Sequence, residues 1–460
     1  MTVKFQLPIV KKITTLLTQA LTELDLVVSK RDLQLEHPVN LEFGDYASNV
    51  AMQLFGAIKK PQNTLVGKKN PNSSLQQKPA ATNPYELAQK IVQKLEPLIK
   101  KNPDINAVSV AQPGFINFKL SEQYLLNQLK KILASSASYA QLTKLGQNKT
   151  VVVDYSAPNI AKRFSIGHLR STIIGQALCN LYRLLGWQVI GDNHLGDWGT
   201  QFGKMIVAVK KWAQKPVDQL SIDEMEALYV KFHQEAESEP ALEDLARKAF
   251  KNLEDNQPEE KKLWQQLVET SMQEFQQIYD LLGVEIEYVY GESFYEKIMP
   301  AVIEEAQQKK IAVKSQGALV VNYPQEQLPP AMLLKSDGAT TYFTRDLATI
   351  KFREQQWSPD LYIYEVGAEQ SLHFKQVFWA AELLGWGKQK DFVHIAHGLI
   401  RLKQGKMSTR KGRTVKLNQV LQQAIKQAAK FNQDQRVAQV VGIGAVKYND
   451  LKRSPSSGYT

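Results

Sequence analysis

The chain has 460 residues, of which 43% are hydrophobic and 22% charged, and its formal net charge is +11. This length exceeds one ordinary domain, so we expect two or three domains, each with its own core. No run of about 18 uncharged apolar residues occurs, and the N-terminus lacks an apolar signal core, so we expect a cytoplasmic protein without membrane contact. The basic charge favours a nucleic acid or another phosphate-bearing partner, although many basic proteins bind neither.

The N-terminal part of the sequence has the pattern of a small α+β domain. Residues 1–120 contain 15 Lys and Arg residues against 9 Asp and Glu residues. A helix is expected over about 8–28, and a second helix follows Asn83, which can cap it. Two short strands are expected around Gly114, and residues 59–84 read as a long solvated loop. The basic excess suits a nucleic-acid contact, but a basic solvated surface explains it equally well.

The pattern changes at residue 151 to strand, helix, strand. The apolar stretch VVVDY precedes an amphipathic helix with Leu169, Ile173 and Leu181 on one face, and WQVIGDN follows it. A second strand, helix and strand come at about 360–400, so a doubly wound parallel sheet is predicted. The intervening residues, roughly 204–323, are mostly charged helix, to which we assign a scaffolding role.

The single cysteine, Cys179, lies on the apolar side of the first of these helices. One cysteine excludes an internal disulfide and a cysteine-cluster zinc site. We therefore expect Cys179 to pack in the core, and we expect no metal held by the protein itself.

The connection SAPNIAKRFSIGH, residues 156–168, falls where ligands bind in such sheets, beyond the carboxyl end of a strand. Gly167 lets a ligand approach the backbone, and His168 at the helix start can donate to a phosphate oxygen. Gly-His pairs near helix starts are common, so this feature alone favours an ordinary connection. Asp154, Asn159 and Lys162 place an acid, an amide and a cation beside it, which favours a binding site.

A second signal is RLKQGKMSTRKGRTVKL, residues 401–417. Residues 401–416 hold seven basic residues and no acid. Such a segment can neutralise charge on a departing pyrophosphate, whereas a basic surface hairpin is the simpler alternative.

Together the two signals resemble the class I aminoacyl-tRNA synthetases, whose sites carry loops written HIGH and KMSKS. Here these loops read Ser165-Ile-Gly-His168 and Lys406-Met-Ser-Thr-Arg410. The stretches SAPNIAKRFSIGHLRSTIIG, GDNHLGDWGTQFGKM, SDGATTYFTRDLAT and YEVGAEQSLHF narrow the match to the arginyl-tRNA synthetases. The resemblance covers essentially the whole chain, from FGDYASNVAMQL to GIGAVKYNDL.

The resemblance implies an arginine–tRNA ligase that forms arginyl-adenylate from L-arginine and ATP, then esterifies the 2′-hydroxyl of the terminal adenosine of tRNA(Arg). Magnesium would arrive with ATP, no prosthetic group is needed, and a monomer is expected. The implied catalytic residues are His168, Lys406, Ser165, Gly167 and Lys162. The implied ATP contacts are Gly167, His168, Lys406, Met407, Ser408 and Lys411. The implied arginine contacts are Asp154, Asn159, His168, Tyr342, Asp346 and Gln370, with Asp154 and Asp346 holding the guanidinium.

The domains implied are an N-terminal α+β tRNA-contact domain over 1–135 and a class I Rossmann-like catalytic domain over 136–425, with its helical insertion at about 204–323. Residues 426–460 would begin a helical anticodon-binding domain that is otherwise missing. The loop departs from the family pattern at Ser165, where a histidine is usual. The missing part of the anticodon-binding domain and Ser165 together support an alternative, a non-catalytic or weakly active tRNA-binding remnant. The segment GDNHLGDWGTQFGKM could line the site or form a turn-rich structural corner.

Overall fold

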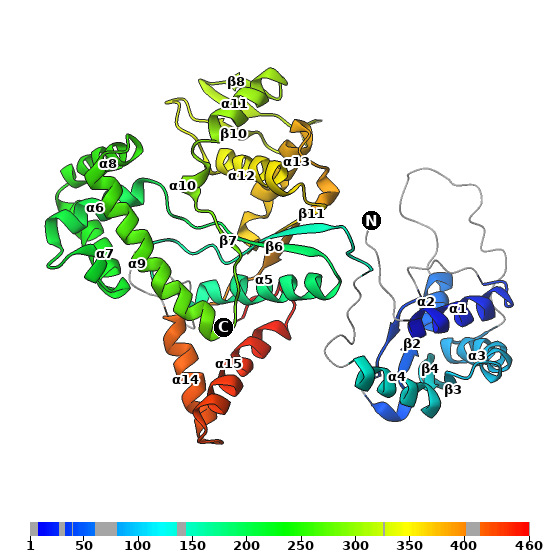
Figure 1. Cartoon of the computed structure of the whole chain (residues 1–460). Coiled ribbons are helices and arrows are strands. Elements are labelled where there is room, and N and C mark those ends of the chain that lie inside the picture. Colours follow the sequence, from blue (N-terminus) through cyan, green and yellow to red (C-terminus); the bar gives the residue numbers. More distant parts are fainter. Residues whose placement is uncertain are drawn as a thin grey trace. The chain divides into compact units, whose positions relative to one another are not determined.

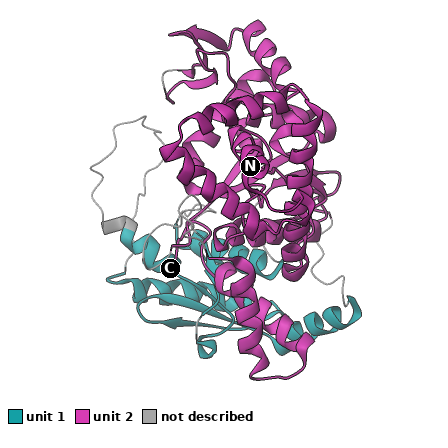
Figure 2. Cartoon of the chain, turned by 90° about the vertical axis from the view of Figure 1, so that its left-hand side faces the viewer, with its two compact units in different colours: residues 1–140 teal, residues 141–460 magenta. Residues whose placement is uncertain are grey.

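The computed structural model describes residues 8–26, 33–38, 40–59, 81–135, 144–324, 327–401 and 415–459 (Figure 1). The chain divides into two compact units, Met1–Ala140 and Gln141–Thr460 (Figure 2). Each unit has its own hydrophobic core.

The first unit packs helices on a four-stranded antiparallel sheet with the strand order β1-β2-β4-β3. Its strands are β1 (Leu35–Glu36), β2 (Tyr46–Ser48), β3 (Ile105–Ala111) and β4 (Phe115–Leu120). Its helices are α1 (Pro8–Thr22), α2 (Val50–Lys59), α3 (Pro84–Lys100) and α4 (Glu122–Ser135). The Asn83 side chain accepts the Glu86 N–H at 2.8 Å and so caps α3, as expected. Helix α1 ends at Thr22, before the expected end at 28, which lies outside the described residues.

The second unit is built on a five-stranded parallel sheet with the order β12-β11-β5-β6-β7. The strands are β5 (Thr150–Asp154), β6 (Gln188–Asn193), β7 (Tyr288–Val289), β11 (Leu361–Gly367) and β12 (Phe392–His397). Asp154 is in register with Asp192 on one side and with Tyr364 on the other. Polar groups therefore gather at the carboxyl ends of the three central strands, and the predicted doubly wound α/β fold is confirmed.

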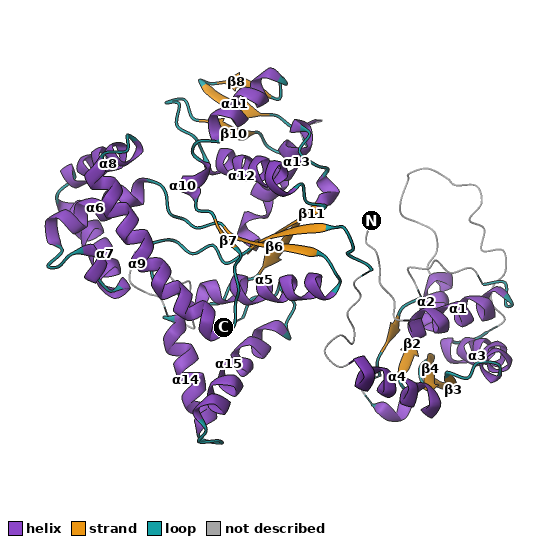
Figure 3. Cartoon of the chain, viewed as in Figure 1, coloured by secondary structure: helices purple, strands orange, loops and turns teal. Residues whose placement is uncertain are grey.

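Helices cover both faces of this sheet and divide its residues between two cores (Figures 1 and 3). One core joins Val151, Val153 and Ile363 with α5 (Ile166–Leu184). The other joins Tyr362 and Tyr364 with α12 (Tyr342–Trp357) and α13 (Ser371–Leu384). The alternation along β11 follows from the pleat, because successive side chains of a strand point to opposite faces.

The buried face of α5 differs from the predicted one. Leu169 and Ile173 are buried as expected, but Leu181 is 55% exposed. The face continues instead through Gln176 and Cys179, which follow Ile173 at intervals of three residues and are both buried. Burial raises the pKa of the Cys179 thiol to about 12, which agrees with a packing role and not a reactive one.

Four long helices form an arm beside the sheet: α6 (Thr200–Trp212), α7 (Ile222–Ser238), α8 (Ala241–Glu254) and α9 (Pro258–Leu282). The chain then returns to the main sheet as β7 and continues through α10 (Glu292–Tyr295) and α11 (Met299–Gln308). A three-stranded antiparallel sheet follows, made of β8 (Ala312–Ser315), β9 (Ala318–Val321) and β10 (Ala331–Leu334), and the sequence pattern did not reveal it. Helices α14 (Leu417–Ala429) and α15 (Gln435–Leu451) form a hairpin, after which the described chain continues to residue 459 (Figure 1).

Candidate active site

The loop that leaves β5 is held in one shape by hydrogen bonds from two helices. The Ser156 N–H donates to Ser171 Oγ of α5 at 2.9 Å, and the Ala161 N–H donates to Ser271 Oγ of α9 at 2.9 Å. Ser156 and Ala161 both have left-handed backbone angles, with φ of 56° and 57°. Non-glycine residues adopt this conformation at a cost of about 1–3 kcal/mol, which the surrounding bonds must offset. The loop is therefore a built structure and not a passive connection.

Ser165 and His168 form a reciprocal cap at the start of α5. The Ser165 N–H donates to His168 Nδ1 at 3.1 Å, so Nδ1 is the acceptor and the ring proton lies on Nε2. Burial, reinforced by the charge of Lys162, lowers the pKa of His168 to about 4. His168 is consequently a neutral imidazole at physiological pH with one N–H to donate. Ser165, where the sequence leaves the usual loop pattern, is itself buried and acts on the histidine.

The start of α5 also receives the described end of the basic segment. The Ile166 N–H donates to Val415 O at 2.9 Å, and the Leu417 N–H donates to Phe164 O at 3.1 Å. Gly167, next to Ile166, lies in the first turn of α5, where the helix dipole favours an anion. The predicted ATP contacts Lys406, Met407, Ser408 and Lys411 lie outside the described residues.

Asp154, predicted to hold the guanidinium of arginine, faces a guanidinium of the protein itself. Arg353, fully buried on α12, donates through Nη2 to Asp154 Oδ2 at 2.7 Å. The same group donates to Asp192 Oδ2 through Nε at 2.9 Å and Nη2 at 2.7 Å. Burial raises the pKa of Asp192 against the opposing charge of Arg353. One oxygen of Asp154 is thus already committed to Arg353.

Three further predicted arginine contacts lie at or near the N-terminal ends of α12 and α13. Tyr342, the first residue of α12, is 66% exposed. Asp346, one turn later, contacts His373 Nε2 from α13. Gln370 is exposed immediately before α13. Buried Tyr364 lies within the electrostatic influence of Asp154 and Asp346 and connects the two groups of residues.

Glu292, at the start of α10, is an acid that the sequence patterns did not single out. Its carboxylate lies 3.7 Å from the guanidinium of Arg345 and within the electrostatic influence of Asp346. Burial raises the pKa of Glu292 to about 7 against the opposing charges of Arg345 and His194, and the charges of Asp346 and Asp197 add smaller increases. An acid three residues after the strand at 288–289 was the available signal, because β7 is parallel to β6 and ends at the same edge of the sheet. Glu292 and Asp346, with Arg345 and His373 beside them, are the acids that this part of the structure offers to a cation.

The segment that follows β6 joins Asn159 to this acid. Asn159 forms a parallel bridge with Gly196, and a Cβ on Gly196 would stand 2.5 Å from Asn159 Oδ1. Asp197 accepts hydrogen bonds from Ser293 N–H at 2.9 Å and Ser293 Oγ at 2.6 Å, beside Glu292. The segment is therefore part of the scaffold of the site, between the loop at 156–165 and α10.

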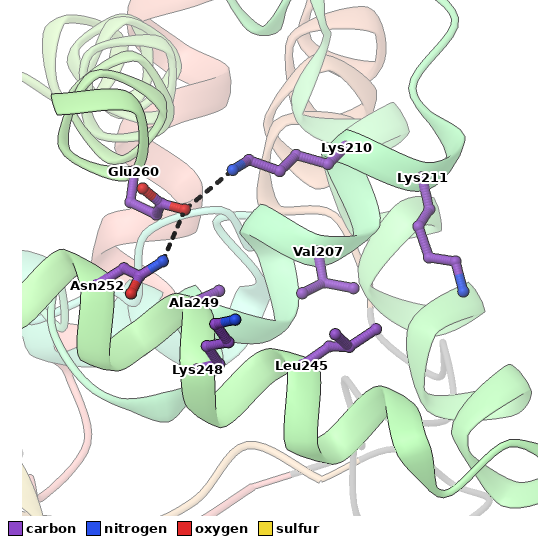
Figure 4. A pocket seen from close by; sticks show the side chains of 8 residues that line it. All are labelled: Val207, Lys210, Lys211, Leu245, Lys248, Ala249, Asn252 and Glu260. Atoms are coloured by element: carbon purple, nitrogen blue, oxygen red, sulfur yellow. Dashed lines mark hydrogen bonds and ion pairs between the residues drawn. The ribbon is translucent and has the colours of Figure 1, made fainter. Parts of the chain in front are cut away.

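A separate hollow of about 280 Å³ lies between α6 and α8 (Figure 4). Its lining combines apolar and polar side chains: Val207, Lys210, Lys211, Leu245, Lys248, Ala249, Asn252 and Glu260. Glu260 accepts from Lys210 at 3.0 Å and from Asn252 at 3.3 Å. Glu260 therefore offsets the charge of Lys210, and none of the residues that line the hollow is among the predicted site residues.

Similarity to known proteins shows the family of this chain. The family described as "tRNA synthetases class I (R), catalytic domain" matches residues 128–460, and "Arginyl tRNA synthetase N terminal domain" matches residues 11–120. The chain belongs to the arginyl-tRNA synthetase family. An arginine–tRNA ligase of Fusobacterium nucleatum subsp. nucleatum is 39% identical over 93% of this chain and 72% of its own length. One from Halothermothrix orenii is 38% identical over 98% of this chain and 76% of its own length.

Solved structures show the same fold. The arginyl-tRNA synthetase of Plasmodium falciparum superposes with a TM-score of 0.72 at 24% identity, covering 98% of this chain and 75% of that one. The Thermus thermophilus arginyl-tRNA synthetase gives 0.69 at 20% identity, with 98% and 76% covered. The fold of the family therefore extends across both units of this chain. None of the described helices is long and apolar enough to cross a membrane.

Proposed function

We propose that this chain activates L-arginine with ATP and transfers it to the 2′-hydroxyl of the terminal adenosine of tRNA(Arg). The observation that carries the proposal is the pairing of two features at one edge of the parallel sheet. One feature is a helix start with a neutral, donating His168, and the other is the acid pair Glu292 and Asp346. The first suits a phosphate and the second suits a guanidinium, as arginine activation requires. The names of the 38–39% identical relatives support the same activity.

In the first step the carboxylate of arginine attacks the α-phosphorus of ATP, the bond to the leaving oxygen breaks, and pyrophosphate departs. No protein nucleophile is needed, so catalysis consists of positioning and charge stabilisation. His168 Nε2–H would donate to a phosphate oxygen, since its Nδ1 is occupied by the Ser165 N–H. Lys162 and the N–H groups at Gly167 would add positive potential, and Lys406, Met407, Ser408 and Lys411 would contact the triphosphate. Magnesium would arrive with ATP.

The guanidinium of the substrate would lie between Asp346 and Glu292. A planar group with five donors pairs well with two carboxylates, and Tyr342 would pack beside it. Asn159 and Gln370 would hold the α-amino and carboxylate end. Asp154, which accepts a hydrogen bond from Arg353, would stabilise the pocket and would not contact the substrate. This assignment replaces Asp154 by Glu292 in the pair of acids that the resemblance implies.

The remaining parts of the proposal concern partners. The unit at 1–140 would contact tRNA(Arg) with its basic surface, and the protein would act as a monomer. Residues 1–120 carry a basic excess, which is the property that attracts a phosphate backbone.

Arginine-dependent exchange of labelled pyrophosphate into ATP, with tRNA present, tests the activity. Citrulline is the matched control, because it has the shape of arginine but a neutral urea in place of the guanidinium. Exchange with arginine and almost none with citrulline is the expected result. The assignment of the acid pair is refuted if citrulline supports exchange as well as arginine does. Absence of exchange with arginine refutes the activity itself.

A further inference from the structure

Arg170 is a fully buried arginine on α5, two residues after His168. Its guanidinium donates through Nη1 to Gly398 O at 2.8 Å and to Ser457 O at 2.6 Å, and through Nη2 to Ser454 O at 3.4 Å. Its Nε lies 2.9 Å from Asp450 Oδ1, and both side chains are 0% exposed. One side chain thus connects α5 with three other parts of the chain: α15, the residues after α15, and the residues after β12.

The residues after α15 fit closely against the residues after β12. The Gly398 N–H donates to Pro455 O at 2.9 Å, and the Arg401 N–H donates to Tyr459 O at 2.9 Å. A Cβ on Gly398 would stand 2.4 Å from Gly458 N, so only glycine allows this approach. The Tyr459 ring lies 5.4 Å from the Arg170 guanidinium and covers it. Residues 454–459 are therefore held beside α5 by specific contacts with Gly398, Arg401 and Arg170.

Burying this guanidinium and carboxylate is expensive and is poor evidence for a role in stability alone. A well-packed apolar pair would serve stability equally well. What the arginine supplies is geometry, because its planar fork can bind several carbonyl oxygens and a carboxylate at fixed angles. A lysine ammonium keeps the charge but loses the fork.

We propose that Arg170 is a positioning residue for adenylate formation, which holds the chain at Gly398 and the residues 454–459 at a fixed distance from the first turn of α5. The inference rests on the proposed function, since it concerns the rate at which the His168 end of α5 promotes the chemical step. Arg170 touches none of the residues proposed to bind arginine, so its loss should slow the step without weakening arginine binding. A shift of about 1 Å between reacting groups and their supports can cost roughly 100-fold in rate.

The test compares Arg170→Lys with Arg183→Lys. Arg183 lies on the same helix and also forms an ion pair, with Glu287, but stands near the far end of α5. The rate of arginyl-adenylate formation is measured in single turnover, per active site, with tRNA present, and arginine affinity is measured by calorimetry. Arg170→Lys should lower the rate by about 10- to 100-fold and leave arginine affinity within about twofold. Arg183→Lys should match the wild type in both.

Tyr459→Ala is the second variant, because it removes the ring that covers Arg170 while leaving the buried ion pair in place. It should give a smaller loss of rate in the same direction, again with arginine affinity unchanged, and it decides the question if Arg170→Lys does not fold. The inference is overturned if folded Arg170→Lys, or Tyr459→Ala in its place, forms adenylate at the wild-type rate. It is equally overturned if rate and arginine affinity fall together. A wild-type protein that forms no adenylate would refute the proposed function, which is a different outcome.

Discussion

The raised pKa of Glu292 leads to a specific prediction about how arginine binding depends on pH. A buried carboxyl with a pKa of about 7 is half protonated at neutral pH in the absence of ligand. The guanidinium of arginine remains charged throughout and attracts the ionised form, so binding should release a proton. Affinity should therefore fall as pH falls through 7, and it should level off above it.

The magnitude follows from the titration. With a pKa of about 7, the ionised fraction falls about tenfold between pH 8 and pH 6, so the dissociation constant for arginine should rise about tenfold, or ~1.4 kcal/mol. Glu292→Gln should remove this slope. At pH 8 it should also weaken binding by about 10- to 100-fold, because a charge-assisted hydrogen bond contributes about 1.5–3 kcal/mol.

Calorimetric titration with arginine at pH 6, 7 and 8, in two buffers of different ionisation enthalpy, measures both affinity and proton release. Glu296→Gln is the matched control, since Glu296 is a nearby acid that accepts from Arg345 Nε at 3.2 Å. It should keep the pH slope of the wild type. The reasoning fails if wild-type affinity is constant from pH 6 to 8, or if Glu292→Gln retains the slope.

The raised pKa of Glu292 also means that its ionised form lowers the free energy of unfolding. A carboxyl whose folded pKa lies above its unfolded value binds more protons in the folded state, so the free energy of unfolding falls as pH rises from about 4.5 to 7. Above pH 7 this contribution is constant. Glu292→Gln should thus unfold at a higher denaturant concentration than the wild type at pH 8 while binding arginine less well. A structural acid would show the opposite effect on stability.

Three further predictions concern other parts of the site. Asp346→Ala should raise the Michaelis constant for arginine by about tenfold or more and that for ATP far less, as measured by pyrophosphate exchange; equal changes in both would remove its guanidinium role. Arg353→Met should lower the free energy of unfolding in urea by about 3–5 kcal/mol, because Asp154 and Asp192 would remain buried without a partner. Adding Asp192→Asn should recover part of that loss, and no recovery would contradict the ion-pair account. Lys406→Ala should slow adenylate formation in single turnover with arginine affinity unchanged, and a normal rate would refute its role at the triphosphate.

The parallel sheet was predictable because its signal is local. Short apolar strands followed by amphipathic helices determine a doubly wound sheet, and the ligand site then follows from the topology. The three-stranded sheet of β8, β9 and β10 was missed, since each strand has only four residues and the first two stand in a charged segment. The alternation of apolar and polar residues that indicates a strand cannot be recognised over four residues.

The position of a side chain at the site was more predictable from the sequence than the residue that it contacts. Asp154 was correctly placed at the end of a strand, but its contact with Arg353 spans 199 residues and leaves no mark in the sequence nearby. Ser165 stood out in the sequence only as a departure from the loop pattern of the family, and in the structure it caps α5 together with His168. Glu292 was missed for a related reason, because burial and neighbouring charges, and not residue type, distinguish it from other acids.

The elements that carry the two parts of the site pack into two different hydrophobic cores of the second unit. Phe164, which packs edge-on against His168 at 5.2 Å, belongs to the core that includes the helical arm. Glu292 and Asp346 stand on α10 and α12, whose apolar residues Tyr295, Phe343 and Leu347 belong to the other core. Substitutions that repack one core can leave the other intact. In evolution or in the laboratory, the choice of amino acid could therefore be retuned from one side of the sheet while the machinery for handling ATP is inherited unchanged from the other.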